Sequence, residues 1–278
     1  MKKIIYIVLF FTMALTAYAV EDTTSIAVAE DVKENAAAIE MLKSDNDSVQ
    51  AAITAYNEGD FYTAANLLSR EIKRAKEEGK ESADLYYNLG NVYFRINELG
   101  QARLNYERAA LLSPSDRDIR HNIDYVMTRI EDKILEVDTL FLSVWFNAVQ
   151  NWFDTNTWAV TGVVLFVLFI FCLVAFFFSK QILIKKISFY IGIVLVLLVL
   201  LSNIFAYKQK RKLDERDTAI IMAASVSVVS SPDINSKELF RLHVGTKVQI
   251  TKDDRNWLEI ELDNGSVGWI QRDKLEII

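Results

Sequence analysis

Two uninterrupted apolar runs decide the fold of this chain: Trp158–Phe178 (WAVTGVVLFVLFIFCLVAFFF) and Ile187–Tyr207 (ISFYIGIVLVLLVLLSNIFAY). Each run is 21 residues long and contains no Asp, Glu, Lys, Arg or His. A helix of that length extends about 31 Å, close to the thickness of a bilayer's hydrocarbon core. A buried helical hairpin of a soluble protein is the alternative, but such helices usually keep a polar stripe. The sequence therefore predicts two transmembrane helices, 158–178 and 187–207, joined by the loop 179–186.

The first 19 residues have the pattern of a secretory signal peptide. The basic start Met1-Lys2-Lys3 is followed by the apolar stretch Ile4–Leu15 and by the small-residue site Thr16-Ala17-Tyr18-Ala19. Cleavage is expected after Ala19, and the alternative is an uncleaved N-terminal anchor. Either outcome exports the chain from residue 20 onward.

The two spans return the chain to the side that it left, so the segments before and after them share one compartment. The export signal places that compartment on the periplasmic, extracytoplasmic side of the cytoplasmic membrane. The loop 179–186 carries three lysines and is expected in the cytoplasm, as the positive-inside rule requires. Four basic residues between Lys208 and Lys212 disagree with that rule, and the export signal decides the orientation.

Charge and composition limit the functions that this chain can have. Residues 20–150 carry 14 basic and 24 acidic residues, and residues 213–278 carry 8 and 12, so nucleic acid is not an expected partner. Residues 179–212 carry seven basic residues and no acid, which predicts contacts with anionic lipid headgroups. Cys172 is the only cysteine, and His121 and His243 are far apart. We therefore expect no metal site, no cofactor and no enzymatic activity.

The N-terminal part begins with residues 20–47, whose polar composition predicts a mobile arm. Residues 83–114 then have the spacing of a tetratricopeptide repeat. Small residues let two helices approach closely, tyrosines fill the space between them and a proline ends the second helix. The residues at the signature positions are Tyr86, Leu89, Gly90, Tyr93, Ala102, Tyr106, Ala109 and Pro114. A generic helical hairpin is the alternative.

An earlier repeat copy begins near Asp45, with Gly59 in its turn and a longer second helix that reaches Gly79. After the N-cap signal Ser115-Asp116, a further helix from Arg117 to about Lys133 is expected to cover the last repeat. Residues 48–138 are therefore predicted to form an all-α tetratricopeptide-repeat solenoid with a capping helix.

A solenoid of this kind offers its concave side to a partner. The amides of Asn88 and Asn91 suit the backbone of an extended peptide, whereas an ordinary solvated role is the alternative for each residue. The predicted groove residues are Ile53, Tyr56, Tyr87, Asn88, Asn91, Phe94 and Arg95.

Residues 139–157 link this module to the first span. Trp145, Phe146, Val149, Trp152 and Phe153 fall on one face of a helix. Trp favours the membrane–water boundary, so we expect an interfacial amphipathic helix. The alternative is that this stripe packs on the repeat module.

Beyond residue 213 the pattern changes to the period of two that is typical of strands. Six short strands are predicted, at 219–222, 225–229, 247–251, 257–262, 266–270 and 275–277, and so many in about sixty residues favour a small all-β barrel. The elements Gly245-Thr246-x-Val248, Trp257 and Asn264-Gly265-x-x-Gly268-Trp269-Ile270 resemble the bacterial SH3 domain. Trp257 and Trp269 are expected to pack in the core and at its rim instead of binding a ligand.

The order of these parts resembles the BatE family, the tetratricopeptide–SH3 proteins of the Bacteroides aerotolerance operon. The resemblance implies a cell-envelope protein that acts beside von Willebrand A-domain membrane proteins and a MoxR-type ATPase in stress tolerance. Two functions are therefore considered. The first is a membrane scaffold that grips a partner protein in the repeat groove, and the second is a tether whose SH3 domain binds peptidoglycan.

Overall fold

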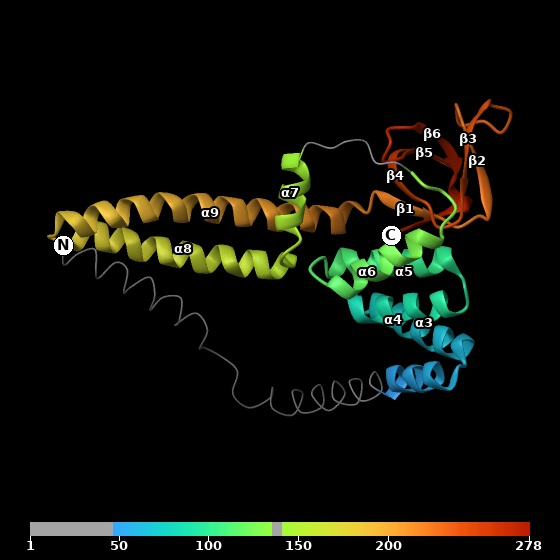
Figure 1. The fold of residues 1–278 in the computed structure, drawn as a ribbon, viewed down its shortest axis with the longest axis horizontal. Coiled ribbons are helices and arrows are strands. Elements are labelled where there is room, and N and C mark those ends of the chain that lie inside the picture. Colours follow the sequence, from blue (N-terminus) through green and yellow to red (C-terminus); the bar gives the residue numbers. More distant parts are fainter. Residues whose placement is uncertain (1–46, 135–140) are drawn as a thin grey trace, which may run out of the picture. The chain divides into compact units, whose positions relative to one another are not determined.

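The computed structural model describes residues 47–134 and 141–278 (Figure 1). The predicted signal peptide, and the predicted arm up to residue 46, lie outside these described residues. From Ala51 to Ile278 the chain forms one compact unit. The described chain contains a helical module (residues 47–134), two long apolar helices and a C-terminal sheet module (residues 217–278).

The helical module is a succession of antiparallel neighbours. Residues 47–58 are helical, and α3 (Phe61–Glu77), α4 (Ala83–Arg95), α5 (Leu99–Leu112) and α6 (Arg117–Arg129) follow. Each helix from α3 to α6 packs on the next one in the chain. The side chains of Asp60 and Ser82 accept hydrogen bonds from the backbone N–H of Thr63 and Leu85, which fixes the starts of α3 and α4. Asp116 caps α6 in the same way.

The closest approach in this module is between α4 and α5. A Cβ atom built on Gly90 would lie 2.7 Å from the ring of Tyr106, so only glycine fits there. Tyr106 and Tyr86 are almost fully buried, as are Ala102 and Ala109. Of the eight residues predicted to pack in the repeat, Tyr93 and Pro114 alone stay half-buried.

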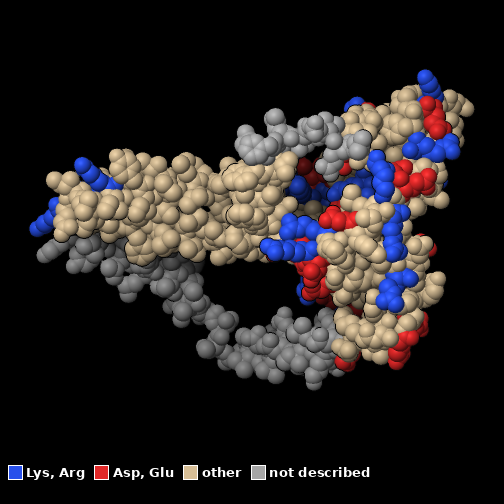
Figure 2. All heavy atoms as spheres, viewed as in Figure 1, with Lys and Arg blue, Asp and Glu red and all other residues tan. Residues whose placement is uncertain are grey.

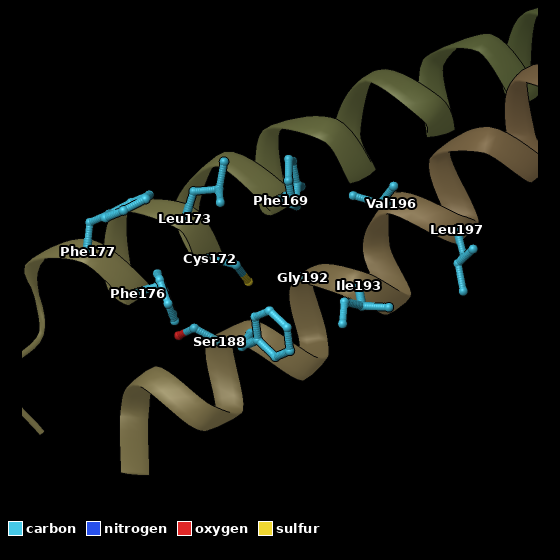
Figure 3. A pocket seen from close by; sticks show the side chains of 11 residues that line it. Phe169, Cys172, Leu173, Phe176, Phe177, Ser188, Gly192, Ile193, Val196 and Leu197 are labelled. Carbon is cyan, nitrogen blue, oxygen red and sulfur yellow. The ribbon is translucent and has the colours of Figure 1, made fainter. Parts of the chain in front are cut away.

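Two helices are long and apolar enough to cross a membrane: α8 (Thr155–Phe178) and α9 (Ile182–Glu215). They pack along each other, with Gly192 beside the ring of Phe169, and both residues line an apolar hollow of about 420 Å³ (Figure 3). Both helices extend beyond the predicted spans. Lys185 and Lys186 lie inside α9 and not in a loop, because lysine is a good helix former whose charge does not end a helix. The connection between the helices is therefore only residues 179–181.

The predicted interfacial helix is shorter than expected, since α7 (Phe141–Gln150) ends before Trp152. Its aromatic stripe is also divided. Phe146 packs on Phe205 of α9, with ring centroids 4.7 Å apart, whereas Trp145 and Trp152 are 58% and 65% exposed. Phe153 packs on Trp158 of α8, with ring centroids 5.1 Å apart, so the stripe contacts the apolar hairpin through two phenylalanines and leaves two tryptophans free for another surface.

Buried polar groups fix α7 to the hairpin. The Gln209 side chain on α9 donates from Nε2 to the carbonyl oxygens of Gln150 (2.8 Å) and Phe153 (2.9 Å). The indole N–H of Trp158 also donates to Gln150 O, at 2.8 Å. These bonds satisfy carbonyl groups at the end of α7 that would otherwise have no partner within the helix. Asp154, just before α8, accepts a hydrogen bond from the hydroxyl of Ser115 in the helical module (2.8 Å).

The C-terminal part is an antiparallel sheet with the strand order β3-β2-β6-β5-β4-β1-β7 (Figure 1). Leu242 of β3 and Leu275 of β7 come from opposite ends of the sheet yet belong to one buried cluster, so the sheet curls around its core. The strands are β1 (Thr218–Ile221), β2 (Ser225–Val229), β3 (Glu238–His243), β4 (Lys247–Asp254), β5 (Trp257–Glu261), β6 (Val267–Gln271) and β7 (Leu275–Ile277).

One sequence-based expectation for this sheet was wrong, the number of its strands. Strand β3 was not predicted, because Leu239 is an apolar residue on the exposed side and hides the alternation of Phe240 and Leu242. The tryptophans do not belong to the core. Leu258, Ile260 and Ile270 point inward, and since side chains alternate along a strand, Trp257 and Trp269 lie half-buried on the outer face, at the rim of the core.

The helical and sheet modules are joined by polar and apolar contacts. Arg103 on α5 donates to the carbonyl oxygen of Gly245 (2.8 Å), and Glu107 pairs with Lys247 (2.6 Å). Leu104 of α5 is buried together with Ile220 of β1. The turn between β3 and β4 therefore rests on α5.

Candidate functional site

The helical module has a groove of about 260 Å³ formed by its first helix, α4, α5 and α6. We call it the helical groove. Amide and aromatic side chains dominate its surface. The lining residues are Tyr56, Asn91, Phe94, Arg95, Tyr106, His121, Asn122 and Tyr125.

A hydrogen-bond network fixes the floor of the groove. The Tyr106 hydroxyl donates to Asn91 Oδ1 at 2.7 Å, and Asn122 Nδ2 donates to the same oxygen at 3.1 Å. Asn122 Nδ2 also lies 3.2 Å from the hydroxyl oxygen of Tyr87, which accepts from it. Burial raises the pKa of Tyr106, so its hydroxyl stays protonated and remains a donor. The two amides are thus held in fixed orientations before any ligand arrives, which reduces the entropy cost of binding.

Two arginines stacked on aromatic rings flank this floor. The Arg95 guanidinium lies 4.8 Å from the ring centroid of Phe61, and that of Arg129 lies 4.9 Å from the centroid of Phe94. Arg129 also donates to the hydroxyl of Tyr125 at 3.0 Å. Cation–π contacts at exposed sites are worth about 0.5–1 kcal/mol each and orient the planar guanidinium. The walls therefore combine positive charge with aromatic surface, which suits a polar chain that carries apolar side groups.

The structure brings together four of the seven predicted groove residues: Tyr56, Asn91, Phe94 and Arg95. Tyr87 lies behind the floor and supports Asn122. Ile53, which is 40% exposed, and Asn88 do not line the groove. These two residues were predicted as groove residues because spacing along one helix indicates which way a side chain points. It does not indicate where the helix that closes the groove lies.

Sequence reasoning missed the contribution of α6. His121, Asn122 and Tyr125 lie on it at positions i, i+1 and i+4, while Ile119 and Val126 are buried against the helices below. The sequence did contain a signal for this, since an amphipathic capping helix that buries one apolar face leaves its opposite, polar face available to line a groove. Tyr106 was also missed, because its ring fills the repeat while its hydroxyl reaches the groove.

In residues 47–134 and 141–278 no group of three His, Cys, Asp or Glu side chains is arranged to hold a metal ion. The groove offers hydrogen bonds, aromatic surface and positive charge. These are the properties of a site that binds.

A second candidate surface is the outer face of the sheet. Trp257 is paired with Gln271 and Trp269 with Glu259, so the two tryptophans are diagonal neighbours on adjacent strands. Glu259 accepts hydrogen bonds from Lys252 (3.0 Å) and Thr251 (2.8 Å), which together lower the pKa of its carboxyl group. The face therefore presents two aromatic rings beside a carboxylate that stays ionised.

Comparison with protein families identifies the sheet. Residues 225–276 match the bacterial SH3 domain family. The match begins at β2 and ends within β7, so this SH3 domain includes both tryptophans and the β3–β4 turn that rests on α5. The resemblance seen in the sequence is confirmed for these residues. Comparison with curated proteins gives no match.

Proposed function

We propose that the protein is a non-enzymatic membrane scaffold that holds an extended segment of a partner protein in the helical groove. The observation that carries this proposal is the meeting of amide and aromatic side chains from several helices in one groove with a preformed floor. Asn91 still has its Nδ2 donor and Asn122 its Oδ1 acceptor available for a peptide backbone. The stacked arginines add attraction for acidic side chains of the partner.

We further propose that the helical module consists of tetratricopeptide repeats. In this assignment residues 47–58 pair with α3, α4 pairs with α5, and α6 covers the last repeat. The spacing of residues 83–114 supports it, as does the close contact of Gly90 with Tyr106. Repeats of this kind bury their faces only against neighbours, so a covering helix is expected at an open end.

The scaffold is proposed to be anchored in the cytoplasmic membrane by α8 and α9, with both modules on the extracytoplasmic side. The apolar hairpin and the signal-like N-terminus support this placement. The order of parts, with the SH3 domain after the hairpin, supports a BatE-like role beside von Willebrand A-domain membrane proteins in stress tolerance.

Site-directed photocrosslinking tests the groove. A photoreactive phenylalanine analogue is placed at Tyr125, which lines the groove and is 45% exposed, in the full chain in its native membrane. The matched control carries the same analogue at Tyr62, which is 73% exposed on α3 outside the groove. We expect a discrete crosslinked protein from position 125 alone, and Arg95→Ala should reduce its yield while Arg70→Ala should not. Equal crosslinking from both positions would contradict the proposal.

A second function is favoured by the outer face of the SH3 domain, where Trp257 and Trp269 are available to a ligand. Half-buried tryptophans that reach the surface provide flat apolar patches with a polar edge, and this suits binding of peptidoglycan. The full chain in detergent should then sediment with purified sacculi, and Trp269→Ala should abolish sedimentation. Trp152→Ala, at an exposed tryptophan outside the domain, is the control. Failure of the unchanged protein to sediment would remove this function.

A further inference from the structure

A second polar pocket, of about 520 Å³, lies where α5, α9 and the SH3 domain meet. We call it the junction pocket. Its volume falls within the range of small-ligand sites. It is separate from the helical groove, since the two share no lining residue.

The α9 side of the junction pocket lies just past the end of the apolar run. Gln209 and Lys212 line the pocket and follow Tyr207 by two and five residues. At 1.5 Å per residue they lie roughly 3 and 7.5 Å beyond the apolar run, and the headgroup layer extends roughly 5–7.5 Å beyond the hydrocarbon core on each side. In Figure 2 the hairpin is tan along its length, with blue Lys and Arg side chains at both ends. With the hairpin across a bilayer, this pocket opens at the depth of the lipid headgroups.

Most of the charged groups in the junction pocket already have partners. Glu107 pairs with Lys247 at 2.6 Å, and Asp217 accepts a hydrogen bond from Gln249 at 2.7 Å. The side chains of Lys212 and Asp263 are different, because neither forms an ion pair or a hydrogen bond with any residue in the described ranges. The pocket therefore presents one cation from α9, which is attracted by the nearby Asp217, and one anion from the SH3 domain. Neither is hydrogen-bonded or ion-paired within the described residues.

A ligand that satisfies both groups must itself carry both charges. We propose that the junction pocket binds the phosphoethanolamine headgroup of a membrane phospholipid, with its phosphate toward Lys212 and its ammonium toward Asp263. Arg120 also lines the pocket and adds a second donor for phosphate. A headgroup with only negative charge would meet the carboxylates of Asp263 and Asp217. A choline headgroup has no N–H to donate to them, and such cations favour aromatic cages.

Native mass spectrometry of the full chain, delipidated in detergent, tests the proposal. Phosphatidylethanolamine, phosphatidylglycerol and phosphatidylcholine with identical acyl chains are added in equal amounts. We expect phosphatidylethanolamine to be retained preferentially. Lys212→Gln should weaken its binding roughly tenfold, the effect of losing one hydrogen bond to a charged group. Lys210→Gln removes the same charge two residues away but outside the pocket, and it should leave binding unchanged.

The substitution Asp263→Asn provides an independent test on the SH3 side of the junction pocket. It should remove the preference for phosphatidylethanolamine over phosphatidylglycerol, whereas Asp214→Asn, outside the pocket, should preserve it. Equal retention of the three lipids, or unchanged selectivity in both pocket variants, would overturn the proposal. Binding of water-soluble glycerophosphoethanolamine without retention of the lipid would also overturn it, because the source would then be a free metabolite.

Discussion

Asp132 binds both the backbone and the ring of His243. Its Oδ2 accepts a hydrogen bond from the His243 backbone N–H at 2.7 Å, and its Oδ1 lies 2.7 Å from His243 Nδ1. The hydroxyl of Thr246 donates to Oδ2 as well, at 2.6 Å. One carboxylate after the end of α6 thus holds the whole β3–β4 turn of the SH3 domain against the helical module.

This contact predicts that the stability of the interface between the helical module and the SH3 domain, here called the joint, depends on pH. The hydrogen bond to Asp132, then its negative charge, raises the pKa of His243 above its ordinary value despite some desolvation. Burial raises the pKa of Asp132, but the hydrogen bonds from Thr246 and His243 outweigh it and the net shift is downward. The charged histidine therefore stabilises the joint fully below a pH of about 6.5, and this contribution is lost as the pH rises through the raised pKa.

Thermal unfolding of the full chain in detergent between pH 5 and pH 8 measures this effect. We expect the unchanged protein to lose stability across this range, and His243→Asn, which keeps a polar group near Nδ1, to lose less. Identical pH profiles of the two proteins would show that the histidine does not carry the effect.

Gly90→Ala should destabilise the helical module by about 1–3 kcal/mol, because the added methyl group would lie 2.7 Å from the Tyr106 ring. The sign of this change in unfolding free energy is informative. In an unhindered helix, alanine in place of glycine stabilises by about 1 kcal/mol. Denaturant unfolding of the full chain measures the difference, with Asn66→Ala on the exposed face of α3 as a control. A gain in stability for Gly90→Ala would refute the close contact of α4 with α5.

Gly245→Ala should cost more stability than Gly265→Ala. Both glycines have positive φ, at +87° and +79°, so both substitutions introduce backbone strain of about 1–2 kcal/mol. Only Gly245 is also crowded, since its added Cβ would lie 2.8 Å from Ile130, whereas nothing lies within 4 Å of the equivalent atom at Gly265. The difference in unfolding free energy isolates the packing of the SH3 domain on the helical module, and equal losses would argue against that packing.

Gln209→Leu should loosen α7 from the hairpin. The substitution leaves the carbonyl oxygens of Gln150 and Phe153 without the amide that serves both, at a cost of about 1–3 kcal/mol. Gln181→Leu makes the same chemical change at an exposed position before α9 and should have little effect. Limited proteolysis between α7 and α8 reports the loosening. Equal cleavage of the two variants would contradict this role for Gln209.

Local patterns in the sequence predicted the helices and strands better than they predicted the tertiary contacts between them. The long apolar runs and the alternation within Ser225–Val229 are local signals, and helices and strands appear there. Three of the eight residues that line the helical groove come from α6, whose position depends on packing that no spacing within α4 reveals. The joint of Arg103 with Gly245 links residues 142 positions apart, and neither residue is unusual in its own segment.

Helix α9 runs without interruption for 34 residues, or about 51 Å, from the turn of the apolar hairpin to the chain that becomes β1. Arg216, directly after its last residue, forms an ion pair with Glu81 before α4. The same end of α9 is therefore attached to both modules, to the sheet through β1 and to the helical module through Arg216. A tilt of this helix in a bilayer, caused by thickness or tension, would be transmitted as force to the SH3 domain and the helical module at once.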